Sequence, residues 1–109
     1  MKVKILGTTY TIKEKDKNQD PLLERCDGYC DKTTHTIVVL KSSDVNELGD
    51  FEEYKKKVKR HEIIHAFLFE SGLHENFQHS EWGHDETTVD WFASQFPKMV
   101  EAFKKVGCL

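Results

Sequence analysis

Residues 59–72 read KRHEIIHAFLFESG and contain the pattern H-E-x-x-H, formed by His61, Glu62 and His65. Residues four apart on an α-helix lie on the same face, so both imidazoles can point at one metal ion. Glu62 is rotated about 100° from His61 around the helix, which places its carboxylate beside such an ion rather than on it. There a carboxylate can take a proton from water that the ion activates. The stretch therefore predicts a helix that carries two metal ligands and a general base.

The flanking residues predict where this helix begins and ends. Asp50 followed by Glu53 is a capping-box pattern, so we expect the helix to start near Phe51. Gly72 is typical of a C-terminal stop. After His61 the helix is apolar nearly all round, with Ile63, Ile64, Ala66, Phe67, Leu68 and Phe69. Such a helix is expected to be buried, where histidine and glutamate are costly unless a metal ion partners them.

A catalytic zinc ion usually has three protein ligands and a water, so a third ligand is expected downstream. The acidic and histidine candidates are His74, His79, His84, Asp85, Glu86 and Asp90. Glu86 and Asp90 lie four apart in ETTVD, at the start of a second expected helix. Glu86 is the favoured ligand and His84 the runner-up, while Asp90 can accept the far N–H of a ligand histidine. The alternative is that both acids are ordinary residues of a helix N-terminus.

A second helix is predicted to begin near Asp85–Glu86, because an apolar stripe at helical spacing follows. Its members are Val89, Phe92, Ala93, Phe96, Met99, Val100 and Phe103. Pro97 lies within the stripe. A proline there removes one backbone hydrogen bond and crowds the carbonyl of Ala93, so we expect a kink or a break.

Strands are predicted in the N-terminal part of the chain. Period-two patterning around Gly7 predicts a hairpin over residues 2–6 and 9–14. Residues 28–40, GYCDKTTHTIVVL, predict a second hairpin with a strand near Tyr29 and another at Thr36–Leu40. Because the latter is continuously apolar after Thr36, it is expected to be buried on both faces.

Composition limits the classes of protein that the chain can belong to. It has 109 residues, which indicates one domain over 1–109, and its 38% hydrophobic and 32% charged content is typical of globular proteins. The net charge of −3 argues against a general nucleic-acid binder. No apolar run approaches the roughly 18 residues of a membrane span, and the N-terminus does not read as a signal peptide, so a cytoplasmic location is expected. We expect an α+β domain: antiparallel hairpins packed on the H-E-x-x-H helix and on the glutamate-bearing helix.

The three cysteines, Cys26, Cys30 and Cys108, argue against a disulfide framework. The spacing in CDGYC favours two free thiols on a turn or strand. A separate zinc or redox site formed by Cys26, Cys30 and His35 is the alternative.

Together, HEIIHAFLFESGL and ETTVDWFASQF resemble the ImmA/IrrE-type metallopeptidases, which have a gluzincin arrangement. The resemblance covers roughly residues 28 to 97. In the family motif E-x-x-A-N-x-F-A, Glu86 falls on the ligand glutamate, Val89 on the alanine, Asp90 on the asparagine and Phe92–Ala93 on F-A. This chain has S-Q-F-P where the family has L-L-M-P, and the family's helix-turn-helix extension is not expected within these 109 residues. It therefore resembles a minimal, phage-type minigluzincin with a zincin-like fold.

The resemblance implies a zinc metallopeptidase with one Zn²⁺ ion, acting on a regulatory protein in a phage or mobile-element context. Possible donors to the transition-state oxyanion are Tyr29, Tyr54, His79 and His84. A protein or peptide substrate would bind in extended form by β-addition, on an edge strand from the hairpin that contains Thr36–Leu40. The alternative is a non-catalytic zinc protein whose surface binds a regulator.

Overall fold

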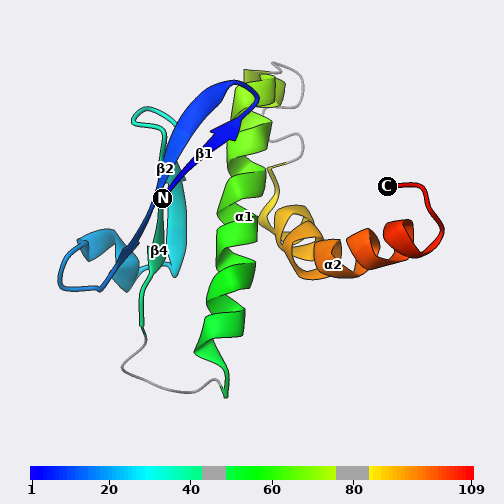
Figure 1. The fold of residues 1–109 in the computed structure, drawn as a ribbon. Helices are drawn as coiled ribbons and strands as arrows, with labels where there is room; N and C mark the ends of the chain where they lie inside the picture. The colour runs from blue at the N-terminus through cyan, green and yellow to red at the C-terminus, as the bar shows by residue number, and fades with distance from the viewer. Residues whose placement is uncertain (43–48, 76–83) are drawn as a thin grey trace.

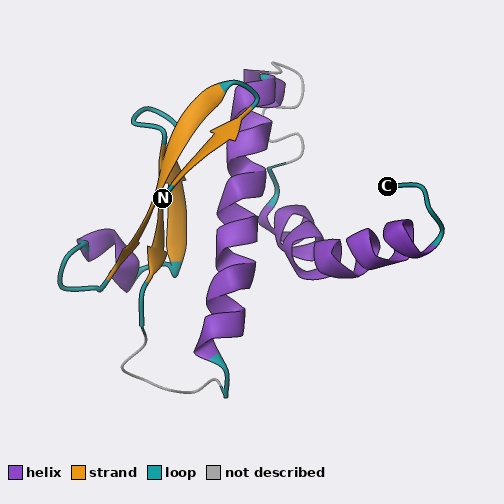
Figure 2. Cartoon of the chain, viewed as in Figure 1, coloured by secondary structure: helices purple, strands orange, loops and turns teal. Residues whose placement is uncertain are grey.

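The computed structural model describes residues 1–42, 49–75 and 84–109, which form an α+β domain (Figure 1). These residues form a four-stranded sheet and two α-helices, with short 3₁₀ turns at Pro21–Glu24 and Leu73–Glu75. The elements are β1 (Lys2–Ile5), β2 (Thr8–Lys15), β3 (Gly28–Asp31), β4 (Thr36–Leu40), α1 (Phe51–Ser71) and α2 (Glu86–Lys105). Helix α1 lies along one face of the sheet, and α2 crosses α1 on the side away from the strands (Figure 2). None of the helices in the described ranges is long and apolar enough to cross a membrane.

Both predicted hairpins are confirmed, since β1 pairs with β2 and β3 pairs with β4 in antiparallel fashion. The prediction of an antiparallel sheet is wrong, however, because β2 and β4 join the two hairpins in parallel. The strand order is β1-β2-β4-β3. In this register Ile12 lies beside Ile37, and both belong to the core cluster that packs under α1. The sheet is therefore mixed, and its parallel pairing aligns the apolar residues of the two hairpins on one face.

Strand β4 is buried on both faces, as its apolar run predicts. Ile37 and Val39 belong to the core cluster that contains residues of α1, and neither exposes any surface. Val38 and Leu40 point to the opposite face and pack against Leu23 of the first 3₁₀ turn. A strand in the middle of a sheet with both faces covered needs this continuous apolar sequence.

The predicted limits of α1 are confirmed. The carboxylate of Asp50 accepts a hydrogen bond from the backbone N–H of Glu53 at 3.2 Å. At the other end Gly72 has φ of 83°, a left-handed conformation that glycine adopts without steric penalty, and its N–H donates to the carbonyl of Phe69. The Glu53 side chain binds Lys56 at 3.0 Å.

The expectation that the second half of α1 is enclosed on all sides is wrong. Among the described residues, the sheet covers one face of this half and the first turns of α2 cover a second, so a third face is left open. The buried residues of α1 are Lys55, Val58, Glu62, His65 and Ala66. By contrast, 43% of Phe67 is exposed, and Ile63, Ile64 and Leu68 are half-buried.

Helix α2 begins where it was predicted to, with the carboxylate of Asp85 accepting from the N–H of Thr88 at 2.9 Å. It continues through Pro97, so the expected break does not occur. Proline cannot donate to the carbonyl of the residue four positions earlier, which is Ala93. That carbonyl instead accepts a hydrogen bond from Nε of Arg60 on α1, at 2.6 Å. A side chain from the neighbouring helix thus satisfies the backbone oxygen that Pro97 leaves without its usual partner.

Candidate metal centre

Two histidines of α1 and the first residue of α2 meet at one point. Oε2 of Glu86 lies 2.9 Å from Nε2 of His61, and Oε1 of the same carboxylate lies 3.0 Å from Nε2 of His65. One ligand atom from each residue lies within 4.8 Å of the other two. This group could hold a metal ion, because two imidazole nitrogens and a carboxylate oxygen are a common ligand set for zinc.

Packing of α2 on α1 brings Glu86 to the histidines. Val89 and Ala93, one and two turns into α2, are fully buried at the contact with α1. Asp85 is used as the N-cap, which leaves Glu86 as the first helical residue facing α1. Burial lowers the pKa of His65 and so favours its neutral form, the form in which imidazole binds a metal.

Glu62 lies next to this group and is not one of the three ligating residues. Only 7% of the residue is exposed, and it lines the cleft together with His61 and Glu86. Burial raises the pKa of the Glu62 carboxyl to about 7; the charge of His61 opposes the rise and that of Glu86 adds to it. The Glu62 carboxyl thus lines the same cleft as two residues of the group that could hold a metal ion.

Asp90 lies behind His61. Its Oδ1 is 3.4 Å from Nδ1 of His61, the ring nitrogen that does not face Glu86. The same carboxylate oxygen lies 3.4 Å from Nζ of Lys57. This is the position expected for a residue that orients a ligand histidine and fixes its tautomer.

His84, the runner-up for third ligand, lies behind His65 instead. Its Nδ1 is 3.0 Å from Nδ1 of His65, and the two rings are stacked with an interplanar angle of 6°. The Nε2 atom of His84 is buried and has no hydrogen-bond partner among the described residues. Glu86 rather than His84 therefore completes the group at the two Nε2 atoms.

The other possible third ligands are placed elsewhere or not described. Asp85 caps α2, and Nε2 of His74 contacts Oε1 of Glu75 at 2.9 Å. His79, which was also considered as an oxyanion donor, lies outside the described residues.

The two tyrosines proposed as oxyanion donors both bind carboxylates. Tyr29 donates its hydroxyl to Asp20 and packs on the face of the sheet opposite to the middle of α1. Tyr54 donates to Asp27 and lines the same cleft as Glu62. Burial and this hydrogen bond raise the pKa of Tyr54 to about 12, so its hydroxyl keeps its proton at neutral pH. Tyr29 also lines a cleft that contains Glu62 and Glu86, so the hydroxyl of each tyrosine is engaged by a carboxylate near the candidate site.

A cleft runs between the metal group, formed by His61, His65 and Glu86, and the edge of a strand. In the second hairpin β4 is paired on both sides, so among the strands that the structure describes the free edge belongs to β3 rather than to Thr36–Leu40. The N–H of Leu40 donates to the carbonyl of Asp27. Because hydrogen-bonded pairs alternate along an antiparallel ladder, Gly28 and Cys30 direct their backbone groups away from β4, to the free edge. These two residues also line the cleft with Glu62.

Gly28 is a site residue that the sequence interpretation overlooked. A Cβ atom at this position would lie 2.8 Å from Cγ1 of Val58, closer than real Cβ contacts allow. The absence of a side chain therefore lets β3 approach α1 next to Glu62. A glycine inside a strand is typical of such a close approach, and this was the signal that could have identified it.

The alternative metal site at Cys26, Cys30 and His35 is not found. Among the described residues, the group that could hold an ion is the one at His61, His65 and Glu86. Burial raises the pKa of the Cys30 thiol to about 12, which disfavours the thiolate that a metal binds. The ring of His35 packs against that of Tyr10 at an interplanar angle of 60°, and its Nε2 lies 3.9 Å from Glu70. Cys26 and Cys30 are free thiols, as the simpler interpretation predicted.

Comparison with known proteins does not assign the chain to a family, since no protein-family model, curated protein or solved structure matches it.

Proposed function

We propose that the chain is a zinc-dependent metallopeptidase with a zincin-like fold. One observation carries the proposal: Glu86, 21 positions beyond His65 in the sequence, contacts the Nε2 atoms of both motif histidines while Glu62 lies beside them in the cleft. A purely structural metal site has no use for a buried carboxylate that is not a ligand. A hydrolytic site needs one as its general base.

The residues have distinct roles in this proposal. His61, His65 and Glu86 would hold the zinc ion, with Asp90 orienting His61. Zinc, when bound, lowers the pKa of water and polarises a carbonyl oxygen. Glu62 accepts the proton of the attacking water and returns it to the leaving nitrogen of the peptide. A carboxyl group with a pKa of about 7 can take up and release a proton at neutral pH.

The free edge of β3 supports a protein or peptide as the substrate. An extended peptide can add to this edge through the backbone groups of Gly28 and Cys30. The cleft between β3 and α1 would then place a peptide bond over Glu62 and the ligands. A regulatory protein of a phage or mobile element is the substrate class that the resemblance to ImmA/IrrE-type peptidases implies.

The role of Glu62 is tested by comparing Glu62→Gln with Glu53→Gln, a matched change at an exposed glutamate of the same helix. Each zinc-loaded protein is incubated with an unfolded protein substrate and a quenched fluorescent peptide library, and its zinc content is measured. We expect Glu62→Gln to keep its zinc and to lose cleavage by about 10²-fold or more, while Glu53→Gln cleaves like the wild type.

Two results would contradict the peptidase proposal. Normal cleavage by Glu62→Gln would show that Glu62 is not the base. If the wild type cleaves none of the substrates and unfolds when zinc is chelated, the non-catalytic zinc protein is the better description.

A further inference from the structure

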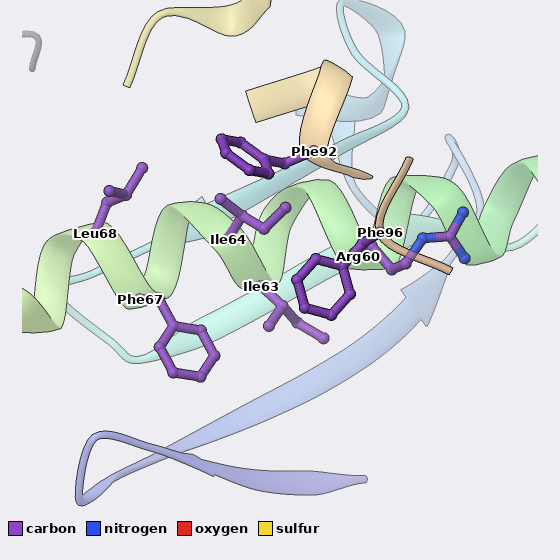
Figure 3. A pocket seen from close by; sticks show the side chains of 7 residues that line it. All are labelled: Arg60, Ile63, Ile64, Phe67, Leu68, Phe92 and Phe96. Carbon is purple, nitrogen blue, oxygen red and sulfur yellow. The ribbon is translucent and has the colours of Figure 1, made fainter. Parts of the chain in front are cut away.

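An apolar groove lies where the open face of α1 meets α2 (Figure 3). None of the residues that line it belongs to the metal group. They are Ile63, Ile64, Phe67 and Leu68 of α1, Phe92 and Phe96 of α2, and Arg60. Figure 3 shows the aromatic rings of Phe67, Phe92 and Phe96 and the two isoleucines around one hollow. Exposed fractions of 38% for Phe92 and 48% for Phe96 show that the described part of the chain leaves this groove open.

The apolar side of α2 continues well beyond the groove. Apolar residues recur along it at alternating spacings of three and four positions: Val89, Phe92, Phe96, Met99, Phe103 and Val106. This spacing is typical of a helix that packs along a second helix. Among the described residues only its first part has a partner, because the second half of α2 extends away from both α1 and the sheet (Figure 1). Phe103 is 37% exposed and Val106 74% exposed.

We propose that this surface binds a second copy of the chain. The second half of α2 from each copy lies antiparallel to α2 of the other and reaches into the groove beside Phe67. One chain carries both the groove and a projecting apolar helix that points away from it. In two copies related by a twofold axis, the projecting helix of each copy can therefore cover the groove of the other. Such an interface is closed, since each copy gives and receives the same helix.

The charges on α2 fit this arrangement. The charged residues in the second half of α2 do not occupy positions of the apolar stripe; they are Lys98, Glu101, Lys104 and Lys105. Bringing two stripes together therefore buries no charged side chain in the seam. The antiparallel orientation also places the positive end of each helix dipole near the negative end of the other.

The exposed aromatic side chains supply part of the area that a dimer needs. Phe67, Phe92, Phe96 and Phe103 are 37–48% exposed, which for side chains of about 200 Å² each amounts to roughly 300 Å² of aromatic surface. A stable dimer buries about 800 Å² per partner. Further area comes from neighbouring aliphatic and polar side chains along the helix pair: Ile63, Ile64, Leu68, Gln95, Met99, Val100 and Val106.

The proposal is tested by sedimentation equilibrium of the full chain, with and without the substitutions Phe96→Glu and Phe103→Glu. The wild type is expected to be a dimer at micromolar concentration, and each substitution is expected to raise its dissociation constant at least tenfold. Trp91→Glu is the matched control, because Trp91 is an exposed aromatic residue of the same helix that lies off the stripe. Circular dichroism of each variant checks that the fold is kept.

Any of four outcomes would overturn the proposal, of which three concern the chain alone. The first is a wild type that stays monomeric at a chain concentration of about 100 µM, since a dimer with a dissociation constant below that concentration would be populated. The second is an assembly that grows beyond two copies. The third is a Trp91→Glu variant that dissociates as readily as Phe96→Glu. A monomer that instead captures a different protein through Phe96 would also overturn it. None of these results bears on cleavage, so the dimer and the peptidase proposals are tested separately.

Discussion

The Nδ1 atoms of His65 and His84 lie 3.0 Å apart, on the side of the His65 ring that faces away from Glu86. One nitrogen must donate and the other accept at this distance. If His65 gives the lone pair of its Nε2 to a metal, its proton is on Nδ1 and His84 is the acceptor. His84 is then a positioning residue for one ligand, as Asp90 is for the other.

We expect His84→Ala to weaken zinc binding by about 10- to 100-fold, the usual effect of removing a residue that orients a metal ligand. The measurement is competition with a chromogenic chelator. His84→Gln, whose amide oxygen can accept from His65, should lose less. Thermal stability of the metal-free proteins separates this role from a structural one, since it should change little. Equal zinc affinity in wild type and His84→Ala would show that the contact has no role in binding.

The two acids of α2 are expected to differ in their effect on the metal. Glu86→Ala removes a ligand of the proposed zinc site, and we expect it to leave the protein without stoichiometric zinc after dialysis. Asp90→Asn keeps an oxygen acceptor near Nδ1 of His61, so we expect it to retain zinc with a smaller loss of affinity. Elemental analysis of the dialysed proteins distinguishes the two. A Glu86→Ala protein with one zinc per chain would place the third ligand elsewhere.

A methyl group at position 28 is expected to separate β3 from α1. Its Cβ would lie 2.8 Å from Cγ1 of Val58 and 3.0 Å from the carbonyl oxygen of Val38. We expect Gly28→Ala to lower the free energy of unfolding by about 1–3 kcal/mol, as overpacking usually does. Urea denaturation measures the change.

Val58→Ala provides the control for this clash. Because it removes the atom that the new methyl group meets, the double variant should be more stable than the two separate losses predict. Strictly additive losses would mean that contact with Val58 is not the cause.

The hydrogen bond from Arg60 to the carbonyl of Ala93 is expected to matter because of Pro97. Arg60→Ala leaves that carbonyl without its donor, so we expect it to lower the free energy of unfolding by about 1.5–3 kcal/mol. In a Pro97→Ala background the backbone N–H of residue 97 can donate to Ala93, and the same substitution should be less costly. Chemical denaturation of the four proteins gives the coupling energy. A coupling energy of zero would separate the role of Arg60 from that of Pro97.

Local sequence was sufficient to predict the individual elements. Asp50 and Gly72 delimit α1, Asp85 begins α2, and the run Ile37–Leu40 identifies a strand covered on both faces. These features depend on backbone hydrogen bonds and side-chain packing within a few residues, so a short stretch determines them. The same holds for the placement of His61 and His65 on one face of α1, which follows from the helical repeat.

Only the tertiary structure decided how these elements meet. The parallel pairing of β2 with β4 and the free edge at β3 depend on contacts between distant segments, for which a single sequence shows no local pattern. That Glu86 meets both Nε2 atoms of the histidine pair, while His84 meets Nδ1 of His65, depends on the packing of α2 on α1. Likewise, α2 continues through Pro97 because Arg60, 37 positions earlier, supplies the missing donor. The sequence by itself thus determined which side chains could bind a metal, and the packing of α2 on α1 decided which of them come together.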